Sequence, residues 1–143
     1  MIKTVFKLLI LVLVFNTHSN AQCGSFTKNK CLPKLKPFLN TQELANTVLL
    51  NGDKTQLTAT FYYGDEYRLL ICAQESLGKI KLNIKDTNDK IIFSTSAYGT
   101  IMWDFNLEST QDLTLEVISA PVDDTQPGGV YSSGCVSIMM GFK

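Results

Sequence analysis

The feature that most constrains this fold is a period of two in hydrophobicity, clearest in the stretch Leu57–Gln74. Apolar residues alternate with polar ones from Leu57 to Tyr63, as in a β-strand with one buried face. From Tyr67 to Cys72 both faces are largely apolar, which indicates a central strand covered on each side. Gly64-Asp65-Glu66 separates the two runs with turn-forming residues, so we predict a β-hairpin at the middle of a sheet.

Similar runs recur along the chain, with turn signals between them. They predict strands at Val48–Leu50, Lys79–Lys85, Ile91–Phe93, Ile101–Leu107, Leu113–Val117 and Cys135–Phe142. The second and third of these form a hairpin, and the lysine face of the second is expected to be solvated. About eight short strands and no convincing helix indicate an all-β sandwich or small barrel, and we favour a jelly-roll-like antiparallel β-sandwich.

The first 21 residues are typical of a secretory signal peptide. Lys3 and Lys7 precede an apolar run, Leu8–Phe15, and Ser19-Asn20-Ala21 resembles a cleavage site. The apolar run is too short for a membrane-spanning helix, which argues against a retained anchor. A lipid-modified Cys23 is disfavoured because Gln22, rather than a small residue, precedes it.

We therefore predict an exported chain with no membrane span after processing, located in the periplasm, at the cell surface or outside the cell. Residues 22–143 are expected to form a single β-sandwich domain with an N-terminal arm. This processed chain keeps 11 basic and 13 acidic side chains and no histidine, a formal charge of about −2. That balance gives no electrostatic reason to expect nucleic acid as a partner.

Four cysteines, an even number in an exported chain, favour disulfides over free thiols. Strand parity directs Cys72 and Cys135 to one outer sheet face, so we predict that they pair and that Cys23 pairs with Cys31. A zinc site is disfavoured, because the processed chain lacks histidine and a C-x-x-C pair.

The segment Cys23–Phe38 carries Lys28, Lys30, Lys34 and Lys36 together with Pro33 and Pro37. The prolines predict an extended arm tied down by its disulfide. The lysines either bind an acidic partner or keep the arm solvated, and four charges favour the solvated arm.

The processed chain has no imidazole, which excludes Ser-His-Asp and Cys-His catalysis. A carboxylate-only hydrolase would need two of the acids Asp65, Glu75, Asp104 and Glu108, and nothing in the sequence selects a pair. The oxygens of Asp86, Asn88 and Asp89 suit calcium, but the same residues are those of a hairpin turn, which we favour. We predict no catalytic residue, metal site or cofactor, and no enzyme activity.

Three tyrosines are the candidate binding surface. Tyr62 is out of phase with its apolar neighbours and should project outward, while Tyr98 and Tyr131 are expected in the loops 94–100 and 120–134. Trp103 is in phase with Ile101 and is expected in the core.

Several short sequences carry a resemblance to a known group of proteins: Thr60-Phe61-Tyr62 with Gly64, Tyr67-Arg68, Leu77-Gly78, Trp103-Asp104-Phe105, Gly134-Cys135-Val136 and Gly141-Phe142-Lys143. Together they resemble small exported β-sandwich proteins of Bacteroidetes-type bacteria that have no assigned function. The order of turn, tyrosine-bearing strand and Asp-Asn hairpin is more distantly similar to bacterial pre-peptidase C-terminal domains. The resemblance implies the fold and the export route and supplies no catalytic residues.

The leading hypothesis is an exported, non-enzymatic binding or structural module that contacts protein or glycan at the cell envelope. One alternative is an inhibitor of a secreted enzyme, for which the segment Pro121–Gly134 is the obvious projecting loop. Another is the carboxylate-only hydrolase.

Overall fold

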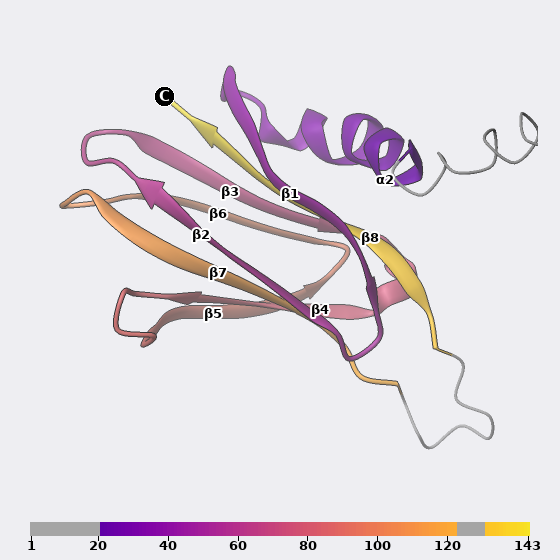
Figure 1. Cartoon of the computed structure of the whole chain (residues 1–143). Helices are drawn as coiled ribbons and strands as arrows, with labels where there is room; N and C mark the ends of the chain where they lie inside the picture. The colour runs from indigo at the N-terminus through magenta and orange to yellow at the C-terminus, as the bar shows by residue number, and fades with distance from the viewer. Residues whose placement is uncertain (1–20, 123–130) are drawn as a thin grey trace, which may run out of the picture.

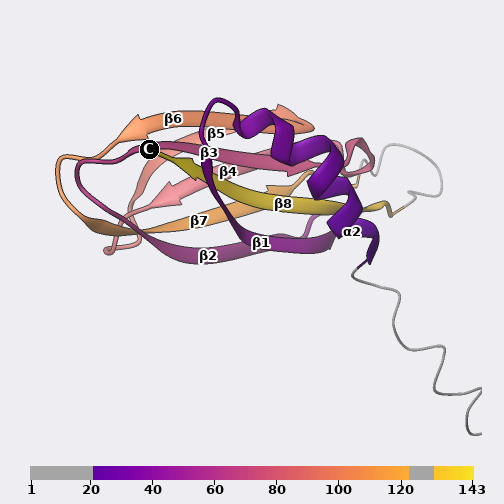
Figure 2. The same ribbon diagram turned by 90° about the horizontal axis from the view of Figure 1, so that it is seen from above.

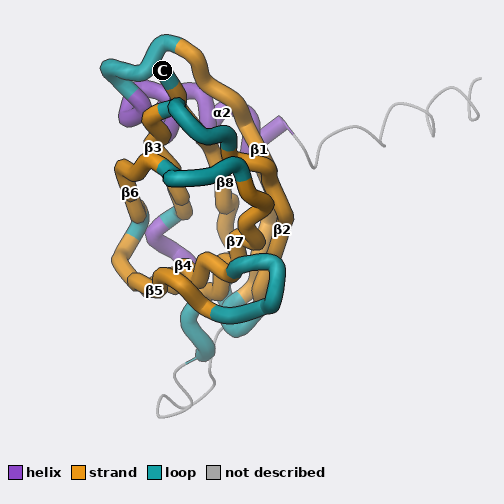
Figure 3. Tube along the Cα trace, turned by 90° about the vertical axis from the view of Figure 1, so that its left-hand side faces the viewer, coloured by secondary structure: helices purple, strands orange, loops and turns teal. Residues whose placement is uncertain are grey.

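The structure is a computed structural model that describes residues 21–122 and 131–143. The described residues form two four-stranded antiparallel sheets packed face to face (Figure 1, Figure 3). Their strands are β1 (Asn40–Leu50), β2 (Lys54–Phe61), β3 (Glu66–Ala73), β4 (Lys79–Lys85), β5 (Ile91–Tyr98), β6 (Thr100–Asn106), β7 (Gln111–Ser119) and β8 (Ser133–Phe142).

The strand order is β1-β8-β3-β6 in the first sheet and β2-β7-β4-β5 in the second. This interleaved arrangement of eight antiparallel strands is a jelly roll, so the predicted fold class is confirmed. The predicted signal peptide lies outside the described residues except for Ala21 and stays a prediction. Within the described ranges no helix is long and apolar enough to cross a membrane.

The predicted hairpin over Leu57–Gln74 is wrong, because β2 and β3 belong to different sheets. The turn at Gly64, whose φ of 94° favours glycine, carries the chain across the sandwich. Phe61 and Tyr67 face each other across the core, with ring centroids 5.1 Å apart. Alternation reveals a buried face, but it does not reveal whether the next run supplies hydrogen bonds or packs from the opposite sheet.

The core lies between the two sheets and is built from their inward faces. Its fully buried members include Phe61, Leu69, Ile71, Leu77, Ile80, Leu82, Ile84, Leu113, Leu115, Val117, Val136 and Ile138. Trp103 packs against this core as predicted and is half-buried, with its ring stacked on Phe93 at 4.4 Å and on Phe105 at 4.1 Å.

The hairpin of β4 and β5 is confirmed. The lysine face of β4 is only partly solvated, because Asn83 is buried and Lys85 half-buried. β1 is longer than predicted: Val48–Leu50 is only the end of an 11-residue edge strand with an irregularity between Glu43 and Ala45. Edge strands bury little surface, so their apolar signal is weak.

The N-terminal segment is helical, and the predicted extended arm is wrong. It consists of α2 (Ala21–Phe26), η1 (Thr27–Cys31) and η2 (Leu32–Leu35), and lies across the outer face of the first sheet (Figure 1, Figure 2). Pro33 falls at the start of η2, where its missing N–H costs no hydrogen bond.

A second apolar cluster joins this helical segment to the sheet. It contains Cys31, Leu35, Leu70, Cys72 and Met139, with Phe26 packed against it. β3 is therefore covered on both faces, as its sequence predicted.

Both disulfides link the helical segment to the sheet. The pairs are Cys23 with Cys135 and Cys31 with Cys72, so the four cysteines are oxidised as expected but both predicted pairings are wrong. Cys72 is in the cluster that packs beneath the helical segment, consistent with the outward side predicted by strand parity. The error arose because the helical layer, which supplies the partners, was not predicted.

The pairing can be tested by mass spectrometry of peptides from the oxidised chain. Sequence separations of 112 and 41 residues predict that double serine variants lose about 5 kcal/mol for Cys23/Cys135 and about 4 kcal/mol for Cys31/Cys72, measured by urea unfolding. A peptide linking Cys23 to Cys31 would contradict the structure.

A glycine substitution tests the packing of Phe38, which follows the helical segment, against Gly141 in β8. A Cβ on Gly141 would lie 2.7 Å from the Cβ of Phe38, whereas a Cβ on Gly24 in α2 would meet nothing within 4 Å. We expect Gly141→Ala to lower the free energy of unfolding by about 1–3 kcal/mol. The control Gly24→Ala should leave it unchanged or raise it by up to about 1 kcal/mol; equal effects of the two variants would argue against this packing.

Candidate functional site

The three predicted tyrosines are all exposed, but they do not form one surface. Tyr62 follows β2, at the end of the sandwich where the β2–β3 and β6–β7 turns meet. The N–H of the neighbouring Tyr63 donates to Thr110 Oγ1 there. Tyr98 ends β5 and Tyr131 precedes β8, at the opposite end. The structure thus separates Tyr62 from the other two.

The predicted loops also change. Residues 94–98 belong to β5, and only Gly99, with a φ of 71°, turns the chain into β6. Strand β5 therefore extends five residues beyond its predicted end, because its exposed serines alternate with half-buried Phe93, Thr95 and Ala97. Of the loop 120–134, residues 123–130 lie outside the described residues, so the inhibitor hypothesis stays a prediction.

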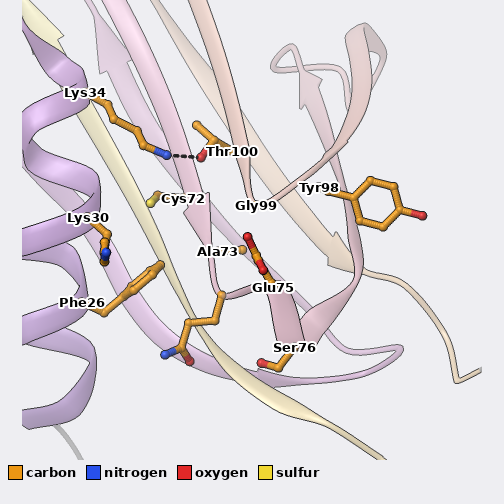
Figure 4. Close-up of a pocket in the computed structure, with 11 residues that line it drawn as sticks. Phe26, Lys30, Lys34, Cys72, Ala73, Glu75, Ser76, Tyr98, Gly99 and Thr100 are labelled. Carbon is orange, nitrogen blue, oxygen red and sulfur yellow. Dashed lines mark hydrogen bonds between the residues drawn. The ribbon is translucent and has the colours of Figure 1, made fainter.

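A cleft of about 700 Å³ opens at the end of the sandwich that carries Tyr98 (Figure 4). We call it the end cleft. Its lining comes from the helical segment, the end of β3 with the following turn, and the β5–β6 turn: Phe26, Lys30, Lys34, Cys72, Ala73, Gln74, Glu75, Ser76, Tyr98, Gly99 and Thr100.

The helical wall of the end cleft presents Phe26, Lys30 and Lys34. Their spacing of four residues places them on one side of a helical segment. The Cys31–Cys72 disulfide fixes this wall to the sheet, and Lys34 Nζ donates to Thr100 Oγ1 at 2.6 Å across the cleft. These residues were not among the predicted site residues, because no helix was predicted here. Their four-residue spacing is visible in the sequence.

The opposite wall is held by hydrogen bonds to β8. Gln74 Oε1 accepts from the N–H of Cys135 at 2.8 Å, and Ser76 Oγ donates to the carbonyl of Ser133 at 2.9 Å. Between them, exposed Glu75 begins the short helix η3 (Glu75–Leu77). Among described residues none donates a hydrogen bond to its carboxylate.

Tyr98 marks the far rim of the end cleft. Its side chain is 75% exposed, and Figure 4 shows the ring directed away from the helical wall. The described lining of the cleft therefore combines two ammonium groups, one carboxylate and the Phe26 ring, with the Tyr98 ring on the outer side of its rim. Such a set can bind a polar ligand with apolar faces.

The acids considered for hydrolysis have other roles or lie apart. Asp104 accepts from Arg68 Nε and Nη2 at 2.7 and 2.6 Å, and this hydrogen bonding lowers the pKa of the Asp104 carboxyl. A general acid needs a raised pKa, so Asp104 does not suit that role. Asp65 accepts from the Tyr67 hydroxyl at 3.1 Å, and Glu75 is at the other end of the sandwich.

The acidic turn after β4 has the geometry of a hairpin turn. Asp86 Oδ1 accepts from the N–H groups of Asn88 and Lys90 at 2.9 and 3.0 Å, and Asp89 has a φ of 62°. Across the described part of the chain, no group of three or more His, Cys, Asp or Glu residues is placed to hold a metal ion.

A polar network lies on the outer face of the second sheet, around Glu116. Its carboxylate accepts from Asn83 Nδ2 at 2.9 Å and from Lys85 Nζ at 3.3 Å, with Lys54 Nζ 3.6 Å away. The Asn83 hydrogen bond is the main cause of a lowered Glu116 pKa, despite burial.

No family model matches the chain, and no curated protein matches it. Ten chains among the solved structures match this chain, including the following three. One is the Aeromonas hydrophila PliG, a periplasmic lysozyme inhibitor of g-type lysozyme, at 12% identity and a TM-score of 0.49, over 72% of this chain and 86% of that one.

The other two are carbohydrate-binding modules. The module CBM36 in complex with calcium and xylotriose has 8% identity and a TM-score of 0.40, over 73% of this chain and 100% of that one. The CBM36-1 domain of a multidomain xylanase from the hindgut metagenome of Trinervitermes trinervoides has 13% identity and a TM-score of 0.36, over 71% and 85%. At these values the similarities carry no argument about a ligand.

The Glu116 network predicts a pH dependence of stability. A carboxyl whose pKa is lower in the folded chain stabilises it above the unfolded pKa, near 4.3, and loses that contribution as pH falls through the folded value. The stability advantage of the unchanged protein over Glu116→Gln should therefore be constant near neutral pH and shrink below about pH 4. Urea midpoints between about pH 7 and pH 3 measure it, and an advantage that does not change with pH would contradict it.

Proposed function

We propose that this chain is an exported, non-enzymatic module that binds a glycan in the end cleft at the cell envelope. The observation that carries the proposal is the cleft itself, which has an aromatic ring at Phe26 and polar groups at Lys30, Lys34 and Glu75, with the exposed ring of Tyr98 at its rim. Sugar rings present apolar faces and peripheral hydroxyl groups, and such a lining complements both.

The construction of the cleft favours binding over catalysis. One wall is attached by a disulfide and the other by hydrogen bonds to β8, so a ligand would meet a largely preformed site and lose less free energy to ordering it. The processed chain has no histidine, and among the described residues of the lining Glu75 is the only carboxylate, whereas two are needed for glycosidase chemistry.

Export is supported by two features. The signal-peptide pattern precedes residue 22, and both disulfides are of the kind that persist in oxidising compartments. The resemblance to small exported β-sandwich proteins agrees with this route.

The proposal is tested with residues 22–143, oxidised, on a glycan array, followed by calorimetry with the best-binding glycan. Tyr98→Ala should weaken binding about tenfold, the size expected for one aromatic contact. Tyr63→Ala is the matched control, because Tyr63 is 69% exposed at the opposite end of the sandwich. Saturable binding that both variants retain would remove the end cleft as the site.

A further inference from the structure

The helical segment is a locally basic surface on a chain of near-zero net charge. From Cys23 to Phe38 it contains four lysines and no acidic residue. Two of them, Lys30 and Lys34, line the end cleft and are exposed. Among ion pairs between described residues none involves either one.

A second pair of lysines lies on the outer face of the second sheet. Lys79 and Lys81 are exposed on the same face of β4, about 7 Å apart along the strand. The nearby acid Glu116 is already engaged by Lys54 and Lys85. Within the described ranges, the ion pairs include neither Lys79 nor Lys81.

Tyr98 lies between the two lysine pairs. It lines the end cleft, and in the antiparallel register of β4 and β5 it is directly opposite Lys79. Directly opposite residues of an antiparallel pair share a sheet face, so the Tyr98 ring lies beside Lys79. The chain also leads from Glu75 in the cleft through η3 and Gly78 to Lys79.

We infer that the glycan of the end cleft is an anionic polysaccharide, which leaves the cleft past Tyr98 and continues over Lys79 and Lys81. This inference depends on the proposed function. Lys30 and Lys34 bind the acidic groups of the polysaccharide inside the cleft, and Glu75 accepts hydrogen bonds from its sugar hydroxyls. Tyr98 stacks on a sugar ring where the polysaccharide passes from the cleft onto the second sheet. A repeating negative charge is what allows one ligand to use both lysine pairs.

The overall charge of about −2 for residues 22–143 is compatible with this ligand. Charges more than about 8 Å away are largely screened at physiological salt, so the local charges matter most: Lys30, Lys34 and Glu75 give the described lining of the cleft a net charge of +1. Nucleic acid is the less suitable polyanion, because the lysines that the ligand would contact form two separate pairs, Lys30 with Lys34 and Lys79 with Lys81, on either side of Tyr98.

The probes are polygalacturonate, its methyl-esterified form, dextran sulfate and dextran, titrated at low and at physiological salt. Polygalacturonate should bind more tightly than its methyl ester, which keeps the sugar backbone and loses the negative charge. Salt should weaken the binding of polygalacturonate. Comparing dextran sulfate with dextran measures the contribution of sulfate groups. Comparing dextran sulfate with polygalacturonate then shows whether sulfate or carboxylate is the preferred acidic group.

The variants are Lys30→Gln with Lys34→Gln, and Lys79→Gln with Lys81→Gln. Each pair should weaken polygalacturonate binding about tenfold, as expected for two partly exposed ion pairs. The control joins Lys28→Gln and Lys90→Gln, two exposed lysines outside the end cleft with the same change in charge, and should bind as the unchanged chain does.

The outcomes separate the two proposals. Equal binding of charged and esterified glycan, with the Tyr98 effect retained, would overturn the anionic ligand and leave the glycan site. Binding of no polysaccharide would overturn the proposed function. Single-stranded DNA binding as tightly as polygalacturonate, with the same loss in both lysine variants, would overturn the glycan in favour of general polyanion binding.

Discussion

The attachment of the helical segment to the first sheet is the constraint on which the rest of this structure depends. Leu70, Cys72 and Met139 make the outer face of β3 and β8 apolar, and without cover this face would be exposed to water. A helical segment of this length is marginal by itself in water. Disulfides to β8 and β3, together with the apolar contacts, compensate for that weakness. The same attachment forms one wall of the end cleft, so fold stability and site geometry share a cause.

The sequence predicted what depends on local pattern. The alternation in β4 and β6 follows which side chains are buried, and the doubly apolar run of β3 follows its cover on both faces. The outward direction of Cys72 follows from the parity of β3. What failed depends on contacts between distant segments. Strands β2 and β3 carry alternation that fits either a hairpin or two facing sheets, and the cysteines were paired with each other because no helical partner was foreseen.

The candidate site shows the same division. The exposure of Tyr98 was predictable, because an aromatic residue beside a glycine turn has little to pack against. The residues across the cleft from Tyr98 were not predictable. Phe26, Lys30 and Lys34 approach the β5–β6 turn only because the helical segment packs over the sheet. Strand phase predicts that Tyr62 is exposed, and an expected loop predicts the same of Tyr98; the two lie at opposite ends because consecutive strands reverse direction.

The non-consecutive pairing of the cysteines bears on how the chain matures. Cys23 and Cys31 are close in sequence, while Cys135, in β8, is synthesised 112 residues after Cys23. Oxidation in order of emergence joins neighbouring thiols and gives Cys23 to Cys31, a bond that the structure does not contain. A Cys23–Cys31 bond formed in this way would have to be exchanged for the two native bonds once Cys72 and Cys135 are available. The host's capacity for disulfide isomerisation, as well as the intrinsic stability of the sandwich, would then set the yield of active protein.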